Sequence, residues 1–436
     1  MSRRHLFLAL SMILASCKDC DETPKPGADA APAPPPRASA DADADAAPPA
    51  PVVDAAPPSD AAASVDEPFG EAGASACRLV WGPAEQPFRG PAALDVAGHE
   101  LRMIVNDGGR PRAFSVAIPP VPPKNTPPFV PPRPTAFVGV RWPGCELAGK
   151  FVYCPTTGGE ITRATLGPNG PTDVKTVTGA KAAASTRLAA APLGADHSVV
   201  AWLEKHKTTE GDMLQAFVSL DDRVGQRLSD EGAGATTMRF FARKGTKARP
   251  ADQAVAVYLD TRTAMVPIHA RTMTLKESEL SLAPDVVLSV GGVPERGVDL
   301  EVAPIGERAL AFIPMPRDTL EFGMAMVAVD DPPKENVPTK WSLYPNGLDP
   351  APMGAAPSRD GKTAWIVRMR PREKAVGSPK ILELGKVDAD GAFASLGEIA
   401  VAAHVTDVLV IEDTLGAVWI LYGDSTITWL ERRACD

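Results

Sequence analysis

The sequence predicts an all-β fold for residues 76–436, a seven-bladed β-propeller. Three observations predict it: short apolar strands recur at steps of about 50 residues, each is followed by a second strand, and helical periodicity is almost absent. Four short strands per unit of about 50 residues, repeated around an axis, are typical of propellers. A four-stranded sheet has two apolar faces, and a ring of such sheets buries both.

Each repeat is recognised by an anchor strand that ends on an aromatic or bulky residue. Five anchors, 56, 54, 53 and 54 residues apart, are Trp202, Tyr258, Phe312, Trp365 and Trp419. Two earlier strands continue the series, Leu101–Ile104 and Phe151–Tyr153. Second strands are expected at Ala113–Ile118, Glu160–Leu166, Leu214–Leu220, Pro267–Thr272, Gly323–Val329, Lys380–Val387 and Thr426–Glu431. The series therefore contains seven units in total. A pair of β-sandwiches is the alternative fold.

Some units also show a strand before the anchor. Arg187–Gly194 and Asp299–Gly306 align with each other over eight residues, and both are apolar. A fourth, weaker strand is expected after the second one, for example at Gly225–Leu228, Asp285–Val290 or Phe393–Ile399.

The two ends of the domain are predicted to share one sheet. The last unit supplies only three strands, and the isolated strand Cys77–Trp81 would complete it. Antiparallel pairing then brings Cys77 beside Cys435, so a disulfide between them would close the ring.

A second disulfide is predicted between Cys145 and Cys154. Gly149-Lys150 can form a two-residue type II′ turn, and the hairpin then places the two cysteines opposite each other at a non-hydrogen-bonded pair. Two free thiols are the alternative. Zinc binding by the four domain cysteines is disfavoured because they lack a C-x-x-C spacing.

The N-terminus predicts a secreted lipoprotein. Arg3 and Arg4 precede the short apolar run Leu6–Leu14, and Leu14-Ala15-Ser16-Cys17 follows. This pattern resembles the lipobox of bacterial lipoproteins, in which the signal peptide (here 1–16) is cleaved and the cysteine, Cys17, is acylated. An ordinary signal peptide is the alternative. The rest of the chain shows no apolar run long enough to span a bilayer, so the lipid is the expected membrane anchor.

Residues 17–75 are expected to form a disordered tether behind the lipidated cysteine. They are rich in Ala, Pro and Asp and nearly devoid of aromatic and branched apolar residues. Such a segment cannot bury enough apolar surface to offset its ordering entropy.

The charge balance of the domain disfavours nucleic-acid binding. Residues 76–436 contain 42 acidic and 40 basic residues, so the folded part is nearly neutral. A sustained basic face is the usual requirement for nucleic acid.

No catalytic or cofactor motif is apparent. The sequence has no H-E-x-x-H, no G-x-S-x-G, no P-loop lysine and no G-x-G-x-x-G after a strand, so we expect no cofactor and no metal. Asp388-Ala389-Asp390-Gly391 lacks the later glutamate of a calcium loop and predicts a tight turn instead. The aromatic anchors are expected to be core, and His269 a satisfied core residue.

A ligand could bind where loops converge around the centre of the ring. The loops that follow the anchor strands share one face of a propeller, and ligand sites favour convergent loops on a rigid scaffold. The candidate residues in these loops are Arg110, His206, Asp260, Arg262 and Arg372.

These observations favour a non-catalytic binding or scaffolding module at the cell envelope. Ser358-Arg359-Asp360-Gly361-Lys362 resembles the Ser-Pro-Asp-Gly-Lys turn of bacterial propeller repeats, departing at Arg359, and the whole domain resembles propeller lipoproteins in its spacing. That resemblance implies a lipid-anchored protein with a protein or glycan partner. Lys18, in place of the aspartate that marks inner-membrane retention in enteric bacteria, favours the outer membrane.

Two other functions remain open. One is a hydrolase or lyase whose carboxylates come from different blades, which would be invisible in sequence. Two acidic residues about 5–10 Å apart near the ring axis, with a raised pKa, would favour it. The other is a part in an envelope assembly.

The lipobox interpretation is tested by labelling cells with a fatty-acid analogue. We expect the protein to incorporate the label and the variant Cys17→Ala to lose it, because the acyl groups attach to that thiol. Unchanged labelling of the variant would contradict the prediction.

Overall fold

The computed structural model describes residues 76–435 apart from 142, 185, 209–210, 231–233, 243–251, 261–266, 291–298, 317–321, 345–351, 373–379, 402–404 and 425. The chain divides into two units, Met1–Glu67 and Pro68–Asp436. The expected signal peptide and tether lie outside the described residues.

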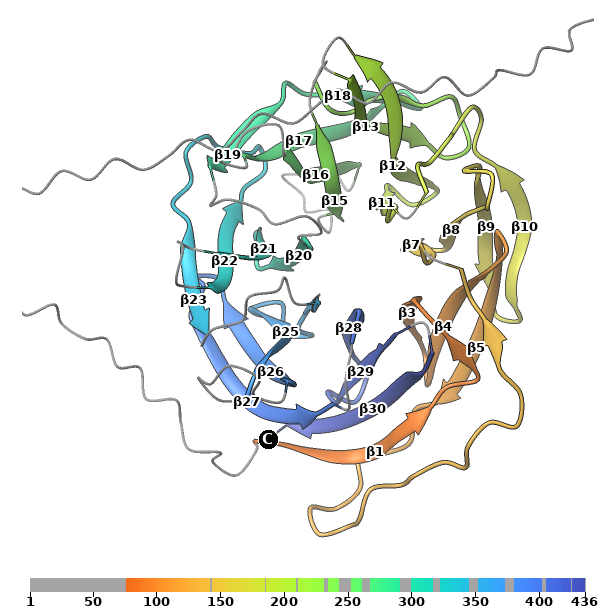
Figure 1. Ribbon diagram of the computed structural model, residues 1–436, viewed down its shortest axis with the longest axis vertical. Coiled ribbons are helices and arrows are strands. Elements are labelled where there is room, and N and C mark those ends of the chain that lie inside the picture. Colours follow the sequence, from red (N-terminus) through yellow and green to blue (C-terminus); the bar gives the residue numbers. More distant parts are fainter. Residues whose placement is uncertain are drawn as a thin grey trace, which may run out of the picture. The chain divides into compact units, whose positions relative to one another are not determined.

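The domain is a ring of seven β-sheets, and the predicted seven-bladed propeller is confirmed (Figure 1). Each blade runs outward from an innermost strand, and neighbouring strands within it are antiparallel. Blade 1 contains β3 (Ala92–Ala97), β4 (Glu100–Asp107) and β5 (Arg110–Ala117). Blade 2 contains β7 (Glu146–Ala148), β8 (Phe151–Pro155), β9 (Ile161–Gly167) and β10 (Gly170–Thr176). Blade 3 contains β11 (Ala189–Leu193), β12 (His197–Thr208), β13 (Gly211–Leu220) and β14 (Gln226–Arg227).

The remaining blades follow the same plan. Blade 4 contains β15 (Ala235–Ala242), β16 (Gln253–Asp260), β17 (Pro267–Lys276), β18 (Glu279–Leu282) and β19 (Val286–Val290), the last paired with β17. Blade 5 contains β20 (Glu301–Ile305), β21 (Arg308–Pro316), β22 (Phe322–Val329) and β23 (Lys340–Tyr344). Blade 6 contains β24 (Met353–Pro357), β25 (Thr363–Pro371), β26 (Lys380–Asp388) and β27 (Phe393–Ala400). Blade 7 contains β28 (Asp407–Glu412), β29 (Val418–Gly423), β30 (Thr428–Cys435) and β1 (Cys77–Glu85). A short parallel pair, β2 (Phe88–Arg89) and β6 (Val138–Gly139), lies outside the blades.

The core lies between neighbouring blades, where the anchor residues pack. Trp202, Trp365 and Trp419 are at most 1% exposed, and Tyr258 and Phe312 are fully buried. One apolar cluster joins blades 3 and 4, and others join blades 4 and 5 and blades 6 and 7. The aromatic anchors are therefore inter-blade core, as predicted. Among the described residues no helix is long and apolar enough to cross a membrane.

The first strand of the domain completes the last blade. β1 lies antiparallel to β30 on the outside of blade 7, and the register places Cys77 opposite Cys435. Their sulfur atoms form a disulfide across 358 residues of sequence, with the two Cα atoms 4.0 Å apart. The predicted ring closure is confirmed.

The second predicted disulfide is also present. The β7–β8 hairpin pairs Ala148 with Phe151 around a turn in which Gly149 has a φ of +61°, a conformation that favours glycine. The pairing continues outward to the Cys145–Cys154 disulfide, whose Cα atoms are 4.3 Å apart.

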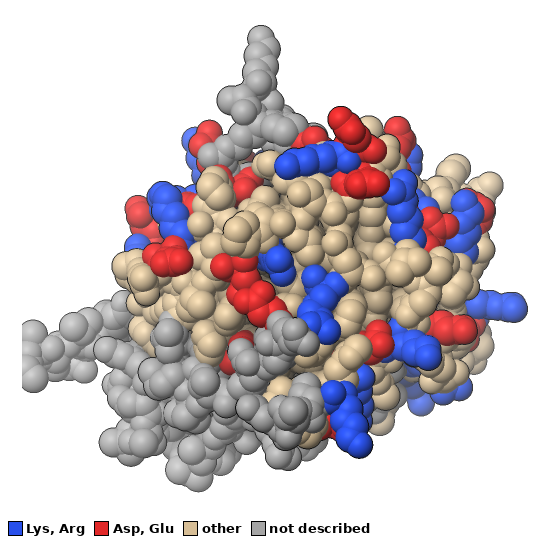
Figure 2. Space-filling view, turned by 90° about the horizontal axis from the view of Figure 1, so that it is seen from above, with Lys and Arg blue, Asp and Glu red and all other residues tan. Residues whose placement is uncertain are grey.

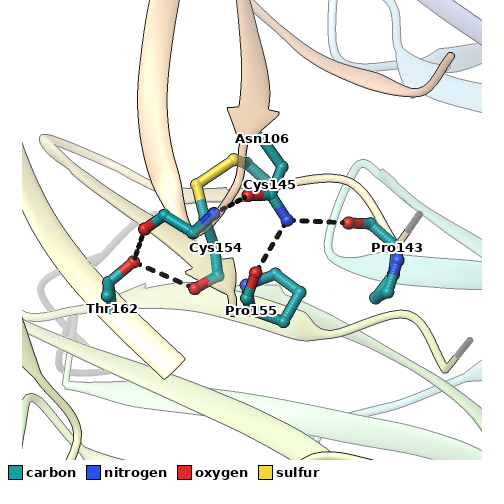
Figure 3. The surroundings of a disulfide bond; sticks show 7 residues. Asn106, Pro143, Cys145, Cys154, Pro155 and Thr162 are labelled. Carbon is teal, nitrogen blue, oxygen red and sulfur yellow. Dashed lines mark hydrogen bonds between the residues drawn. A yellow bond between two sulfur atoms is a disulfide. The ribbon is translucent and has the colours of Figure 1, made fainter. Parts of the chain in front are cut away.

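Buried Asn106 joins this hairpin to blade 1 (Figure 3). Its side-chain amide donates to the carbonyl oxygens of Pro143 and Pro155 at 3.1 and 2.8 Å, and its oxygen accepts from the Gly109 amide at 2.7 Å. This one side chain therefore bonds three backbone groups, and it links the segment before β7 to the end of β8 and to blade 1.

The proline-rich insert Ile118–Pro134 runs along the outer edge of blade 7. The Phe129 amide donates to the Val80 carbonyl and the Phe129 carbonyl accepts from the Gly82 amide, whereas the Phe129 side chain is 61% exposed. Prolines have no amide hydrogen, so a proline-rich cover discourages further strand addition at an open edge.

The two disulfides are expected to contribute unequally to stability. In the chain-entropy model a link across 358 residues contributes on the order of 5 kcal/mol and one across nine residues about half of that. Urea unfolding of Cys77→Ala/Cys435→Ala and of Cys145→Ala/Cys154→Ala measures the difference. Equal losses from the two pairs would show that Cys77–Cys435 does not close a long loop.

Candidate functional site

Charged side chains from five blades meet at the ring axis. Because every blade repeats the same antiparallel order, the innermost strands run the same way and their first residues gather at one end of the axis. Six charged residues at or near these positions form what we call the axial cluster: Glu146, Arg187, Arg239, Asp299, Glu301 and Asp407.

The contacts themselves show that the cluster spans the axis. Arg187 belongs to blade 3, and its guanidinium lies 3.4 Å from Glu301 of blade 5 and 3.7 Å from Glu146 of blade 2. A contact that skips blade 4 has to cross the inside of the ring. The site is thus a property of the closed propeller rather than of one blade.

Arg239 and Glu301 form the tightly bonded part of the cluster. The Nη2 and Nε atoms of Arg239 donate to Oε1 of Glu301 at 2.8 and 3.3 Å, and Nη1 donates to the Met238 carbonyl at 2.9 Å. Burial acts to lower the pKa of Arg239, but Glu301 and Asp299 outweigh it and raise that pKa further above the ordinary arginine value. Arg239 therefore stays charged, and two hydrogen bonds hold it to Glu301.

Arg187 is held more loosely. Its one hydrogen bond in the described part of the chain, to Glu301, is 3.4 Å long, and Asp299 lies 3.8 Å away. These separations exceed the usual 2.7–3.2 Å of an N–H···O bond. The side chain is 19% exposed, so its remaining donors reach solvent.

Asp407 and Glu146 are the least compensated acids. The Asp407 carboxyl makes no hydrogen bond or ion pair within the described residues, and the Glu146 carboxyl has only the 3.7 Å contact to Arg187 there. Burial raises the pKa of Asp407 to about 6, and Arg187 offsets this only in part. Burial likewise raises the pKa of Glu146, against the lowering effect of Arg187 and Arg239. Both carboxyls are half-buried at the axis, where water still reaches them.

Local structure positions each member. Glu146 follows Cys145 directly, so the Cys145–Cys154 disulfide fixes its backbone. Arg239 follows a register shift in the pairing of β15 with β16, between Ala235 and Met238, and such bulges re-aim the side chains after them. Asp407 begins β28, whose register pairs it with Gly423.

The cluster offers hydrogen bonding and charge rather than metal ligation. Among the described residues no group of three or more His, Cys, Asp or Glu side chains could hold a metal ion. Four carboxyls and two guanidiniums instead present many acceptors and several donors at one end of the axis.

The residues predicted from the loops are distributed differently. Arg110 begins β5 and Arg372 follows β25, and both residues are exposed. His206 and Asp260 were expected in loops, and the structure corrects this. β12 pairs with β13 as far as Thr208, so His206 lies within a strand. Arg262 lies outside the described residues.

Structural contacts account for His206 and Asp260. The His206 ring stacks on Phe217 at 5.0 Å and lies 3.4 Å from Glu204. Asp260 is the buried last residue of β16 and accepts from the Gly234 amide at 3.1 Å. No contact within the described residues joins the His206 side chain to the axial cluster.

The other chemical candidates also have structural roles. His269 stacks on Tyr258 and its Nδ1 lies 2.5 Å from Asp285, inside blade 4. The Asp388 carboxylate accepts from the amides of Asp390 and Ala392, so this segment is the tight turn predicted.

Charges of both signs are interspersed on the face of the molecule seen in Figure 2. No patch of one sign dominates the described part of that face, which agrees with the near-neutral charge of the domain. The axial cluster therefore differs from the outer surface in its concentration of charge.

Asp407 is expected to destabilise the fold at neutral pH. Because its folded pKa of about 6 exceeds the ordinary value of 3.8, its contribution is fully present below pH 4 and is lost as the pH rises through 6. Asp407→Asn should raise the unfolding free energy at pH 7 by about 1–2 kcal/mol, after allowance for solvent screening, and change little at pH 4.

Urea unfolding at pH 4 and at pH 7 measures this difference in unfolding free energy. The matched control is Asp390→Asn, which changes an exposed carboxylate. A destabilised Asp407→Asn at pH 7 would contradict the expected cost of this carboxylate.

No protein-family model and no curated protein matches the sequence. Solved structures with similar folds include RRP9 WD40 repeats (11% identity, TM-score 0.43, 82% of this chain and 97% of that one). Others are the α-L-arabinofuranosidase Arb93A from Fusarium graminearum (9%, 0.40, 67% and 91%) and the six-bladed, fucose-recognising lectin of Aleuria aurantia (13%, 0.35, 65% and 91%). At these identities and scores the likeness concerns propeller architecture alone.

Proposed function

We propose that this protein is a lipid-anchored protein of the bacterial cell envelope whose propeller is a non-catalytic binding module, with its ligand site at the axial cluster. One observation carries the location of the site: five blades contribute charged groups to one end of the axis. Within the part of the chain that the structure describes, the carboxyl of Asp407 has no partner and Arg187 makes only long contacts. Convergence of incompletely satisfied polar groups on a rigid scaffold is characteristic of binding sites.

The sequence supports the anchor and the location. The segment Leu14–Cys17 resembles a lipobox, and residues 17–75 have the composition of a flexible spacer. Two disulfides suit an oxidising compartment such as the periplasm or the cell exterior. With Lys18 after the acylated cysteine, we place the protein at the outer membrane, with a protein or glycan partner and no nucleic acid.

One observation favours a second candidate, a hydrolase or lyase. Asp407 and Glu146 come from different blades, and burial raises the pKa of both carboxyls. Glu146 and Glu301 both contact the Arg187 guanidinium, so they lie within about 10 Å of each other, a range that includes glycosidase carboxyl pairs. We prefer the binding function because arginines of the cluster already bond to Glu301. This carboxylate is therefore not available to act as a catalytic base.

The binding proposal is tested with the purified full-length variant Cys17→Ala, kept in detergent, on a glycan array and against envelope proteins. We expect a reproducible ligand whose retention falls at least tenfold in Cys17→Ala/Arg187→Met, because the axial donors are lost. The matched control is Cys17→Ala/Arg308→Met, which removes an arginine at the opposite end of blade 5.

Equal loss in both variants, or no loss in either, would contradict an axial site. Release of a cleaved product during incubation, abolished by Asp407→Asn, would establish the catalytic alternative instead.

A further inference from the structure

The axial cluster brings Arg187, an incompletely bonded donor, to 3.7 Å from the carboxyl of Glu146, and Asp407 adds a second acid at the same end of the axis. Arg187 has five N–H donors and one hydrogen bond, 3.4 Å long, in the described part of the chain. Asp407 has no partner there, and Glu146 lies 3.7 Å from the nearest guanidinium nitrogen. A ligand that completes the site has to accept from Arg187 and donate to the two acids at once.

Because the site presents both hydrogen-bond donors and acceptors to a ligand, we infer that it binds a neutral polyhydroxylated ligand, a carbohydrate. A hydroxyl group donates one hydrogen bond and accepts two, so neighbouring hydroxyls on a sugar ring serve both kinds of partner. This inference rests on the proposed binding function and names its ligand class.

Charged ligands fit the same groups less well. An anion such as a phosphate or carboxylate would meet four carboxyls and only two guanidiniums. A primary amine donates to acids but accepts nothing, so it would leave the donors of Arg187 unfilled and lie close to that like charge. A neutral hydroxyl adds no charge to the cluster and therefore avoids both penalties.

The described innermost strands beside Asp407 begin with uncharged residues. Blades 6 and 1 flank blade 7, and their innermost strands begin with Met353-Gly354-Ala355 and Ala92-Ala93, which carry no charge. The nearest acid in those strands, Asp95, is already paired with Arg102 at 2.6 Å. No cation from these two strands competes for Asp407.

The test uses one sugar ring in three charge states. Saturation-transfer NMR with the full-length Cys17→Ala chain in detergent compares glucose, glucosamine and glucuronate, and then galactose, galactosamine and galacturonate. We expect at least one neutral sugar to bind at least tenfold more tightly than its amino and acidic forms. Adding Asp407→Ala or Arg187→Met is expected to weaken that binding tenfold or more, whereas Asp390→Ala leaves it unchanged.

Each outcome decides a separate claim. Absence of neutral-sugar binding, or tighter binding of the amino or acidic form through Asp407 and Arg187, would overturn the carbohydrate inference and leave the axial site intact. Sugar binding unchanged in both variants would overturn the axial site and with it the proposed function. Thermal unfolding confirms that each variant is folded, and Asp407→Ala, which removes a carboxyl with no hydrogen bond or ion pair among the described residues, keeps the test valid if Arg187→Met unfolds.

Discussion

The structure depends on the pairing of β1 with β30, which closes the ring. Without β1 the last blade has three strands and an open outer edge, and the Cys77–Cys435 disulfide has no partner strand to link. Closure holds seven sheets at fixed angles around one axis, and only in that arrangement do residues from blades 2, 3 and 5 come within 4 Å of one another. The site is therefore a consequence of closure.

The axial cluster combines stable and costly interactions. Arg239 and Glu301 satisfy each other, as expected for charges inside a protein. Asp407 instead loses solvation without gaining a partner among the described residues, and its raised pKa reflects that cost. Charged groups that destabilise a fold and gather at one site are commonly retained for binding or catalysis. At a purely structural site they would be paired with opposite charges or replaced by other residues.

The fold was largely predictable because propeller packing leaves a periodic trace. Trp202, Tyr258 and Trp419 mark the buried second strand of their blades, and the two cysteine pairs followed from strand pairing and a two-residue turn. The cluster was not predicted, because its members are separated by up to 261 residues and each looks like an ordinary strand-end charge. One signal was present: Arg187 and Asp299 occupy the same position in two aligned repeats, with opposite charge. The strand lengths were less predictable, so His206 and Asp260 were placed in loops.

Disulfide mapping by mass spectrometry of non-reduced peptides tests the ring closure most directly. We expect two linked peptide pairs, one joining Cys77 to Cys435 and the other joining Cys145 to Cys154. A Cys77–Cys154 link would contradict the closure, since the first strand would then lie against blade 2, the last blade would stay open, and the axial cluster would lose the frame that assembles it.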